Sequence, residues 1–242
     1  MSSVFLRAEW RRLVMANYLL DPQVLKPYLP ACTELDLWNN NCYISLVGFM
    51  FCNTRVLGMA IPWHRNFEEV NLRFYVRYKE GDEWKRGVVF IKEIVPRRAI
   101  TFVANNLYGE HYITLPMRHT WQENTDQLEV AYEWKWKGHW NRLAVETASQ
   151  AQDITPGSEA EFITEHYWGY TRLTAERTSE YQVEHPCWQV YPVKQYDIDC
   201  DAYSLYGSAF GEVMRQAPAS VFLAEGSDIL VRGGRVFKRD IF

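Results

Sequence analysis

The segment from Glu69 to Tyr78 alternates strictly between polar and apolar side chains, and this pattern limits the fold more than any other feature of the chain. One face carries Val70, Leu72, Phe74, Val76 and Tyr78, and the other carries Glu69, Asn71, Arg73, Tyr75 and Arg77. A period of two residues is typical of a β-strand. Two interpretations remain open: the polar face meets solvent, or it lines a cavity in which Glu69, Arg73 and Tyr75 form a site.

Further strand patterns occupy most of the chain. We expect strands over residues 33–38, 42–52, 86–95, 111–117, 128–137, 139–147, 170–173, 179–185, 188–194, 219–224 and 228–232. The last two should form a hairpin around Glu225-Gly226-Ser227. Because no strand–helix–strand alternation occurs, we predict a mainly β protein with inserted helices (α+β), built on a curled antiparallel sheet or cone-like partial β-barrel.

A few short helices are indicated by their ends. Asp21-Pro22 caps a helix that ends before Pro30, and the apolar spacing over 97–108 predicts a helix that Gly109 stops. A capping box at Ser158 begins a helix that should reach about Tyr167. Another helix is expected over about 203–216. Length and pattern favour one domain over 1–242, with 233–242 a loose C-terminal tail.

Composition and cysteine usage exclude several classes of protein. The formal charge of −4 lacks the excess of Lys and Arg that a phosphate backbone needs, so nucleic acid is a poor partner. The five cysteines form no C-x-x-C pair, which favours a reduced intracellular protein. No signal peptide is visible, and the longest apolar stretch, Tyr43 to Cys52, is too short for a membrane helix. We therefore predict a cytoplasmic protein that does not bind membranes.

Motifs for metals, cofactors and covalent catalysis are missing from the sequence. Glu110-His111, Glu165-His166 and Glu184-His185 bring histidines next to carboxylates, but without the spacing of a zinc site. There is no G-x-S-x-G elbow and no glycine-rich phosphate loop before a helix. We expect no metal site and no cofactor.

Two short stretches stand out as candidate pocket residues. In the strand over 86–95, Lys92 and Glu93 are adjacent charges, and because strand neighbours point oppositely, one of them must face an apolar interior or a pocket. The aromatic cluster around His166 offers a second wall, with Tyr167 and Tyr170 beside it. Plain core packing or a structural ion pair would account for either pattern as well.

Several runs of the chain resemble the YqjF-like family of uncharacterised bacterial proteins, which is placed more distantly with the acetoacetate-decarboxylase-like superfamily. They are Ala8-Glu9-Trp10-Arg11-Arg12-Leu13-Val14, Glu34 to Trp38, Ser45 to Phe49, Glu69 to Val76, Gly87 to Arg98, Thr164 to Tyr170 and Ser220 to Gly226. The resemblance implies a cone-shaped antiparallel barrel around an interior pocket. It also places a pocket glutamate of the distant enzyme at about Glu69. Glu93 matches the glutamate in that enzyme's pattern of Glu, a spacer and Pro-Lys-Lys.

The resemblance departs from the decarboxylase at its reactive lysine. Where that enzyme has Pro-Lys-Lys, this chain reads Pro96-Arg97-Arg98. An imine requires a neutral primary amine, and a guanidinium stays charged at physiological pH, so a Schiff base is not expected here. Two arginines retain the ability to bind a carboxylate or phosphate. If Lys92 and not Glu93 faces inward, its amine would be desolvated and could have a lowered pKa.

Two hypotheses for function follow. The first is an enzyme acting on a small carboxylate or other oxyanion, with Glu93 and Glu69 as catalytic acid or base. The second is a non-catalytic small-molecule-binding module that uses the same pocket. The predicted binding residues are Arg73, Arg97, Arg98, Tyr75, His166, Tyr167 and Tyr170. The expected partner is an anionic small molecule, and a homo-oligomer remains open.

The strands over 70–78 and 86–95 are joined by a short polar connection and should pair as a hairpin. That register places positions 91–93 opposite positions 71–73. A buried Glu93 carboxylate would require a cation, and Arg73 or Arg97 is the expected partner.

Overall fold

The computed structural model describes residues 3–238, without the side chains of residues 103 and 106–108. The strands are β1 (Val4–Leu19), β2 (Thr33–Leu35), β3 (Tyr43–Val56), β4 (Phe67–Glu80), β5 (Glu83–Val95), β6 (Tyr112–Thr114), β7 (Met117–Glu123), β8 (Gln127–Trp136), β9 (His139–Ala148), β10 (Gln152–Asp153), β11 (Trp168–Arg172), β12 (Arg177–Glu184), β13 (Gln189–Tyr191), β14 (Val193–Asp199) and β15 (Ser220–Lys238). The helices are α1 (Arg98–Tyr108), α2 (Glu159–Thr164), α3 (Ala202–Tyr206) and α4 (Ser208–Met214). The predicted class, mainly β with inserted helices, is confirmed.

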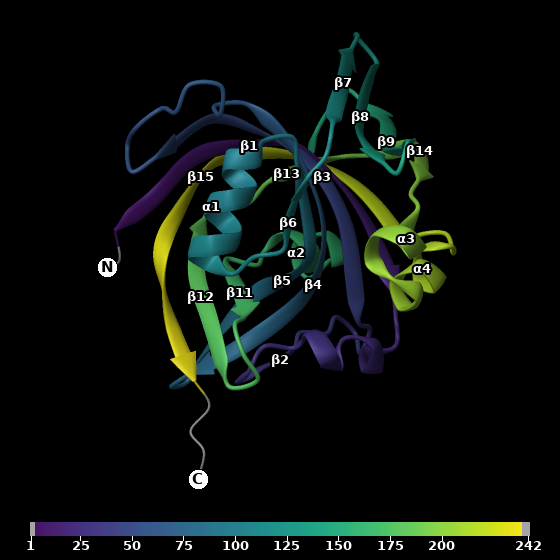
Figure 1. Ribbon diagram of the computed structural model, residues 1–242. Helices are drawn as coiled ribbons and strands as arrows, with labels where there is room; N and C mark the ends of the chain where they lie inside the picture. The colour runs from purple at the N-terminus through teal and green to yellow at the C-terminus, as the bar shows by residue number, and fades with distance from the viewer. Residues whose placement is uncertain (1–2, 239–242) are drawn as a thin grey trace.

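Seven strands of the larger sheet close into a barrel. Their order is β1-β3-β4-β5-β11-β12-β15, and β15 pairs back onto β1 from Asn17↔Ser220 to Val4↔Arg232. Neighbouring barrel strands are antiparallel except β5 and β11, which pair in parallel. The predicted curled sheet is therefore a barrel, and Figure 1 shows its ring of strands with α1 in front of it.

The β4–β5 hairpin follows the expected arrangement, with its turn at residues 81 and 82. Asn71 lies opposite Glu93, and Leu72 lies opposite Lys92, but Arg73 lies opposite Phe90. A bulge between Leu72 and Arg73 causes this shift. It moves Arg73 one position away from Glu93 relative to the predicted register.

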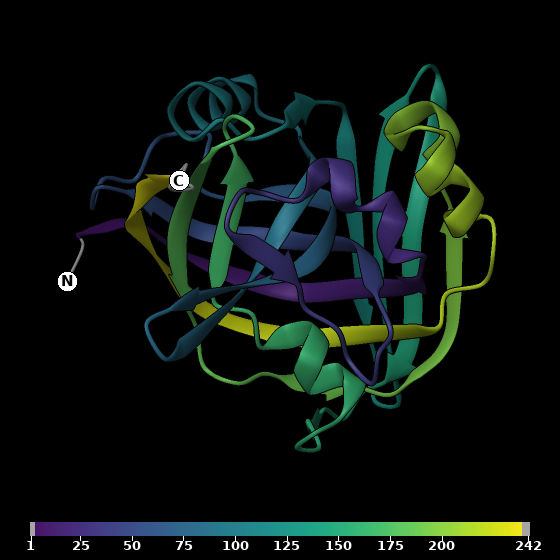
Figure 2. The same ribbon diagram turned by 90° about the horizontal axis from the view of Figure 1, so that it is seen from below.

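A second sheet of four strands, in the order β14-β9-β8-β7, packs beside the barrel and appears at the right of Figure 2. The main apolar core lies between them and includes the fully buried Val130, Tyr132 and Trp134 of β8. Gly48 of β3 permits the close contact, because a Cβ there would fall 2.8 Å from Cδ2 of Tyr132. The outward face of β4 is thus covered by protein.

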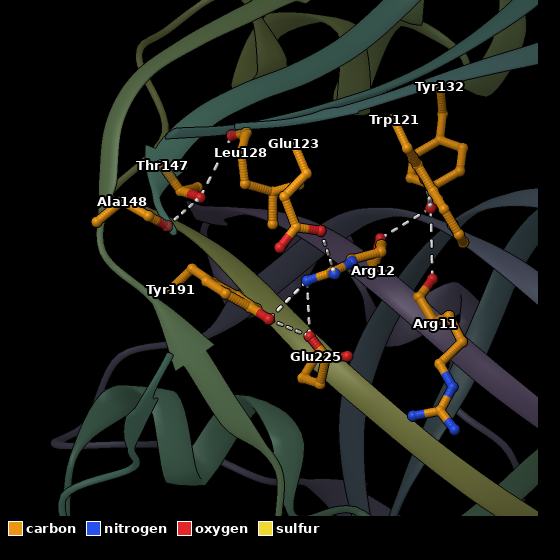
Figure 3. Close-up of polar contacts among 10 residues, drawn as sticks. All are labelled: Arg11, Arg12, Trp121, Glu123, Leu128, Tyr132, Thr147, Ala148, Tyr191 and Glu225. Carbon is orange, nitrogen blue, oxygen red and sulfur yellow. Dashed lines mark hydrogen bonds and ion pairs between the residues drawn. The ribbon is translucent and has the colours of Figure 1, made fainter. Parts of the chain in front are cut away.

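A polar cluster around Arg12 ties the two sheets together (Figure 3). The Arg12 guanidinium donates to Tyr191 Oη (2.6 Å) and Glu225 Oε2 (2.7 Å) and lies 3.3 Å from Glu123 Oε2 of β7. Tyr132 Oη donates to the Arg12 carbonyl oxygen (2.9 Å). Arg12 has a φ of 55°, at the bulge where β1 shifts register against β3. This strained position lets one side chain reach both sheets.

The helices α1 and α2 lie on opposite sides of the barrel in Figure 2, α1 at the upper left and α2 at the bottom. α1 ends at Gly109 in the left-handed conformation, as predicted. The Ser158 side chain accepts from the Glu161 amide as the predicted cap of α2, although α2 ends at Thr164. Within residues 3–238, no helix is both long and apolar enough to cross a membrane.

The predicted C-terminal hairpin and tail are wrong. Residues 220–238 form one continuous strand, β15, which pairs with β1, β12 and β13. Gly226 has a φ of 80° and lies so close to β1 that a Cβ would fall 1.9 Å from the Trp10 carbonyl oxygen, so it permits close strand packing rather than a turn. Residues 233–238 are paired strand and not a loose tail, while 239–242 lie outside the described residues.

Other differences from the sequence prediction are local. β1 was not predicted, because bulges at Arg7/Glu9 and Arg11/Val14 interrupt its alternation. The helix expected over 203–216 is two short helices separated at Gly207, whose φ is 95°. The helix expected after Asp21 is two 3-10 turns, Pro22–Val24 and Lys26–Tyr28.

Candidate functional site

β4 turns its polar face into the barrel. Glu69, Asn71 and Arg73 are each at most 8% exposed and line an interior cavity of about 290 Å³. Phe67, the first residue of the same strand, lines the cavity as well. Strand alternation explains why these four residues line the cavity, since every second residue of β4 points inward. The polar face of β4 therefore meets a cavity and not bulk solvent.

Three glutamates gather on this wall. Glu69 of β4, Glu93 of β5 and Glu110, which follows α1, all line the cavity and are at most 9% exposed. Glu69 accepts hydrogen bonds from Asn71 Nδ2 (2.9 Å) and Tyr112 Oη (3.2 Å), and Glu110 accepts one from Thr171 Oγ1 (2.6 Å). Glu93 Oε2 has no hydrogen-bond partner among the described residues.

Burial changes the protonation of these glutamates. It raises the pKa of Glu69 and of Glu110 to about 7. Burial, together with the neighbouring Glu110 and Glu69 carboxyl groups, raises the pKa of Glu93 well above its usual value. The cluster therefore holds protons near neutral pH and can release or accept them there.

Tyr112 and Tyr181 complete this part of the wall. Burial and the adjacent glutamates raise the pKa of both phenols well above the usual range, so both remain protonated. A neutral phenol can donate a hydrogen bond. The polar wall therefore offers donors as well as carboxyl oxygens.

Arg73 is the cation of the cavity. No ion pair or side-chain hydrogen bond of Arg73 occurs within the described part of the chain, and its Nε is buried without a partner. Its charge favours the ionised form of Glu69 nearby. A buried guanidinium without an ion-pair partner is unusual, because its desolvation is left uncompensated.

His166 is held in one orientation by Asp36. The Nε2 atom of His166 lies 3.1 Å from Asp36 Oδ2, which also accepts from Arg86 Nε (2.6 Å). Burial opposes ionisation of Asp36, but the hydrogen bonds from His166 and Arg86 outweigh it and lower its pKa. Burial lowers the pKa of His166 to about 4, so the ring is neutral at physiological pH. Because Nε2–H donates to Asp36, Nδ1 is left as an acceptor.

An adjoining wall is aromatic and comes mainly from β1 and β3, where Phe49 is the cross-strand neighbour of Glu69. Trp10, Phe49, Phe51 and Phe67 all line the cavity and contact one another. The ring centroids of Trp10 and Phe49 are 5.3 Å apart, and Phe51 stacks on Phe67 at 4.7 Å. The cavity thus has one polar and one aromatic side.

Residues that both line the cavity and reach the surface mark its opening. Ile61, in the connection between β3 and β4, is 43% exposed, and Ala99 at the start of α1 is also exposed. His64 and Ile100 lie beside them on the lining. The opening is therefore bounded by the β3–β4 connection and α1.

The structure brings together some of the predicted site residues and separates others. Glu69, Glu93, Arg73 and His166 line the cavity. The remaining predicted residues, Tyr75, Tyr167, Tyr170, Arg97 and Arg98, are not part of its lining. Tyr75 follows Arg73 on the same face of β4 and is buried. Its hydroxyl shares a hydrogen bond with Ser45 Oγ (2.6 Å), and its ring centroid lies 4.7 Å from that of His166.

The other separated residues have structural surroundings of their own. Tyr167 Oη donates to Glu165, and Tyr170 packs on Phe237 and Tyr78 on the outer side of the barrel. Arg97 precedes α1 as its N-cap residue, and Arg98 is exposed on the first turn. Neither arginine lines the cavity, although Ala99 and Ile100 of the same helix do, so ligand binding by this pair stays a prediction.

The predicted ion pair between Glu93 and an arginine is also wrong. No ion pair of Glu93 occurs among the described residues, and its direct cross-strand neighbour is Asn71. The β4–β5 bulge displaces Arg73 to the position opposite Phe90. Lys92 points away from the cavity, where its Nζ donates to the Leu205 carbonyl oxygen.

Sequence reasoning missed four polar groups of the site: Asp36, Glu110, Tyr112 and Tyr181. Asp36 comes from the segment after β2 and Tyr181 from β12, so no local spacing joins them to β4. Glu110 was noticed only as part of a Glu-His pair. Its position directly after the Gly109 helix stop was the available signal, since chain reversals return residues to a sheet.

No group of three or more residues suited to hold a metal ion occurs in residues 3–238. The three cavity glutamates therefore do not form such a group. No lysine occurs among the described lining residues.

A protein-family model matches most of the chain. The model of DUF2071, described as "Uncharacterized conserved protein (COG2071)", matches residues 7–228. The uncharacterized protein YqjF of Bacillus subtilis (strain 168) is 30% identical over 125 residues, which cover 51% of this chain and 49% of YqjF. The aligned part thus spans about half the length of that curated relative. The predicted YqjF-like resemblance is confirmed.

Solved structures similar to this chain share the acetoacetate-decarboxylase-like fold. Acetoacetate decarboxylase from Legionella pneumophila has a TM-score of 0.66 at 13% identity, covering 96% of this chain and 87% of that one. An acetoacetate decarboxylase-like enzyme from Sphingomonas wittichii RW1 gives 0.67 at 11%, covering 98% and 94%. The enduracididine biosynthesis enzyme MppR complexed with pyruvate gives 0.65 at 14%, covering 98% and 91%. At these identities the likeness concerns the fold.

Proposed function

Because the chain belongs to the DUF2071 family of uncharacterized conserved proteins and has the acetoacetate-decarboxylase-like fold, we propose that its barrel cavity binds a small carboxylate or other oxyanion. In this proposal Arg73 binds the anionic group, and Glu93 and Glu69 act as acid or base on the bound molecule. MppR, which shares the fold, forms a complex with pyruvate, so small oxo acids are the first ligands to test.

One observation carries the proposal. The Arg73 guanidinium is only 8% exposed, lines the cavity and has no ion-pair partner among the described residues. The partly buried Arg86, by contrast, has a carboxylate partner in Asp36 (2.6 Å). A carboxylate ligand would compensate the Arg73 charge, with two parallel N–H···O bonds as the favoured geometry.

The protonated glutamates support the acid–base part. At neutral pH a carboxyl group with a pKa near 7 is divided between a form that donates a proton and a form that accepts one. A protonated carboxyl group can also donate a hydrogen bond to a bound oxyanion. Two such groups, Glu69 and Glu110, line the cavity together with Arg73 and suit a ligand whose charge changes during a reaction.

The proposal excludes the Schiff-base route. The β5 lysine nearest the predicted site is Lys92, and its amine contacts the Leu205 carbonyl and the Tyr206 ring outside the cavity. Arg97 and Arg98 cannot form an imine. We also propose a cytoplasmic location, which the five free cysteines support.

Thermal unfolding with pyruvate and with acetoacetate tests the proposal. A ligand at 100 times its Kd stabilises the folded state by about 2.7 kcal/mol, which raises the Tm of a chain of this size by several degrees. We expect this shift in the wild type and in Arg98→Gln, a matched control that removes an exposed arginine. Arg73→Gln should abolish it. Equal shifts in Arg73→Gln and wild type, or no shift of the wild type with either acid, would overturn the proposal.

A further inference from the structure

Four buried polar atoms on the cavity wall have no hydrogen-bond partner among the described residues: Asn71 Oδ1, Arg73 Nε, Glu93 Oε2 and His166 Nδ1. Each belongs to a side chain that is at most 8% exposed. Asn71 and Arg73 follow each other on the inward face of β4, and Glu93 lies directly opposite Asn71. The Tyr75 ring lies 5.8 Å from Arg73 Cζ and 4.7 Å from the His166 ring, so His166 is near Arg73 as well. The four atoms are therefore within reach of one small molecule.

The roles of two of these atoms are fixed by their neighbours. Asn71 Nδ2 donates to Glu69 Oε1, so its Oδ1 atom is the free acceptor. His166 Nε2 donates to Asp36, so its Nδ1 atom is also an acceptor. Among the four atoms only Arg73 Nε must be a donor. Three of these four atoms can therefore accept a hydrogen bond, and no donor among the described residues is bonded to them.

A simple carboxylate matches only part of this wall. Its oxygens accept hydrogen bonds, so they satisfy Arg73 but not Asn71 Oδ1 or His166 Nδ1. The cavity also contains three glutamates against a single arginine, and an added anion increases that excess of acidic groups. A ligand that carries a cationic N–H donor next to its carboxylate would donate hydrogen bonds to these acceptors. Its positive charge would also offset the excess of acidic groups.

The aromatic wall indicates what the rest of the ligand is. Trp10, Phe49, Phe51 and Phe67 present ring surface to the cavity, and Ile61 continues this surface to the opening. Two polar atoms on the lining, Trp10 Nε1 and Thr54 Oγ1, also lack a partner. A cavity of about 290 Å³ has room beyond the polar groups for an apolar side chain to pack on these rings.

We propose that the ligand is an amino acid with an aromatic or large apolar side chain. This inference rests on the proposed function, which supplies the contact between the ligand carboxylate and Arg73. The ligand ammonium group binds the acceptors of Glu93, Asn71 and His166. The side chain packs against Trp10 and Phe51.

Isothermal titration with four related compounds tests each part separately. Phenylalanine has the carboxylate, the ammonium and the ring; 3-phenylpropionate lacks the ammonium; 2-phenylethylamine lacks the carboxylate; alanine lacks the ring. We expect phenylalanine to bind at least tenfold more tightly than each of the others. Equal or tighter binding of 3-phenylpropionate or of alanine would overturn this inference and leave the proposed function standing. Equal binding of 2-phenylethylamine, or no binding of any acid, would instead overturn the proposed function.

Proton exchange gives an independent readout. An ammonium group beside the glutamates favours their ionised form, so phenylalanine binding at pH 7 should release protons to the buffer. 3-Phenylpropionate should cause proton uptake, because a second anion favours the protonated glutamates. Titration in two buffers of different ionisation enthalpy measures the sign. Proton uptake with phenylalanine would contradict the inference.

A variant pair completes the test. Glu93→Gln should reduce the preference for phenylalanine over 3-phenylpropionate at least fivefold while 3-phenylpropionate still binds. Glu180→Gln is the matched control, because Glu180 is a buried glutamate whose Oε2 also lacks a partner, but it pairs with Lys85 and Arg235 and does not line the cavity. An unchanged preference in Glu93→Gln would overturn the assigned ammonium contact.

Discussion

The two faces of β4 are equally withdrawn from solvent but have different surroundings. Val70, Leu72, Phe74 and Val76 are fully buried in the apolar core between the barrel and the smaller sheet. On the other face Glu69, Asn71 and Arg73 surround a cavity, and several of their neighbours' polar atoms have no protein partner. Burial alone therefore does not distinguish the core from the site. The two differ in whether their buried polar atoms have hydrogen-bond partners within the protein.

The largest expected effect concerns the apolar face. Phe74→Ala removes a ring that is 0% exposed and packs between Ile44 of β3 and Val89 of β5. We expect the free energy of unfolding to fall by about 3–5 kcal/mol, through lost apolar burial and a new void. Urea denaturation measures this value.

Tyr75→Phe is the matched change on the opposite face of the same strand. It removes only the hydroxyl that shares a hydrogen bond with Ser45, and should cost about 1 kcal/mol. A loss for Tyr75→Phe as large as that for Phe74→Ala would contradict the distinction between the two faces.

The next effect concerns pH. The folded-state pKa of Glu69 and Glu110 is about 7, above the value near 4.3 of an unfolded chain, so between these values the native state binds more protons than the unfolded state. The free energy of unfolding should therefore fall as pH rises. Above pH 6.5 only a small part of the opposite contribution of His166, whose pKa is lowered to about 4, remains. Between pH 6.5 and 8 we expect a loss on the order of 2 kcal/mol.

Glu110→Gln checks the source of that loss. The amide keeps the hydrogen bond from Thr171 but does not ionise, so this variant should lose less stability between pH 6.5 and 8 than the wild type. Denaturant titrations at both pH values measure the two slopes. A wild type that becomes more stable over this range would show that the glutamates are not held protonated by burial.

The smallest expected effect is a null result on the outer side of β5. Pyruvate with borohydride should leave Lys92 unmodified, because its amine lies outside the cavity beside Leu205 and Tyr206. Acetoacetate should likewise remain undecarboxylated. Mass spectrometry detects an adduct, and an adduct at Lys92 together with turnover would restore the Schiff-base mechanism.

The parts of the fold that sequence reasoning predicted are those with local signals. The alternation of β4, the hairpin to β5 and the Gly109 helix stop all depend on residues close together in the chain. β1 and β15 close the barrel, yet bulges in β1 and the left-handed Gly226 in β15 interrupt their patterns. A bulge and a turn look alike in sequence, because both favour glycine and a broken alternation.

The candidate site follows the same rule. Glu69, Arg73 and Glu93 were found because they lie on one strand pair, and His166 because aromatic residues surround it. Asp36 comes from a distant segment, and only the closed barrel brings it to His166. The direction of the chain after Pro96 likewise depends on how α1 packs.

In the proposed function Arg73 binds the carboxylate of a ligand inside the barrel. A crystal structure of the protein grown with saturating pyruvate tests it most directly. We predict that both carboxylate oxygens lie within hydrogen-bond distance of the Arg73 guanidinium, between the glutamate wall and the aromatic wall. Pyruvate bound only at the surface, or oriented with its carboxylate away from Arg73, would contradict this role of Arg73.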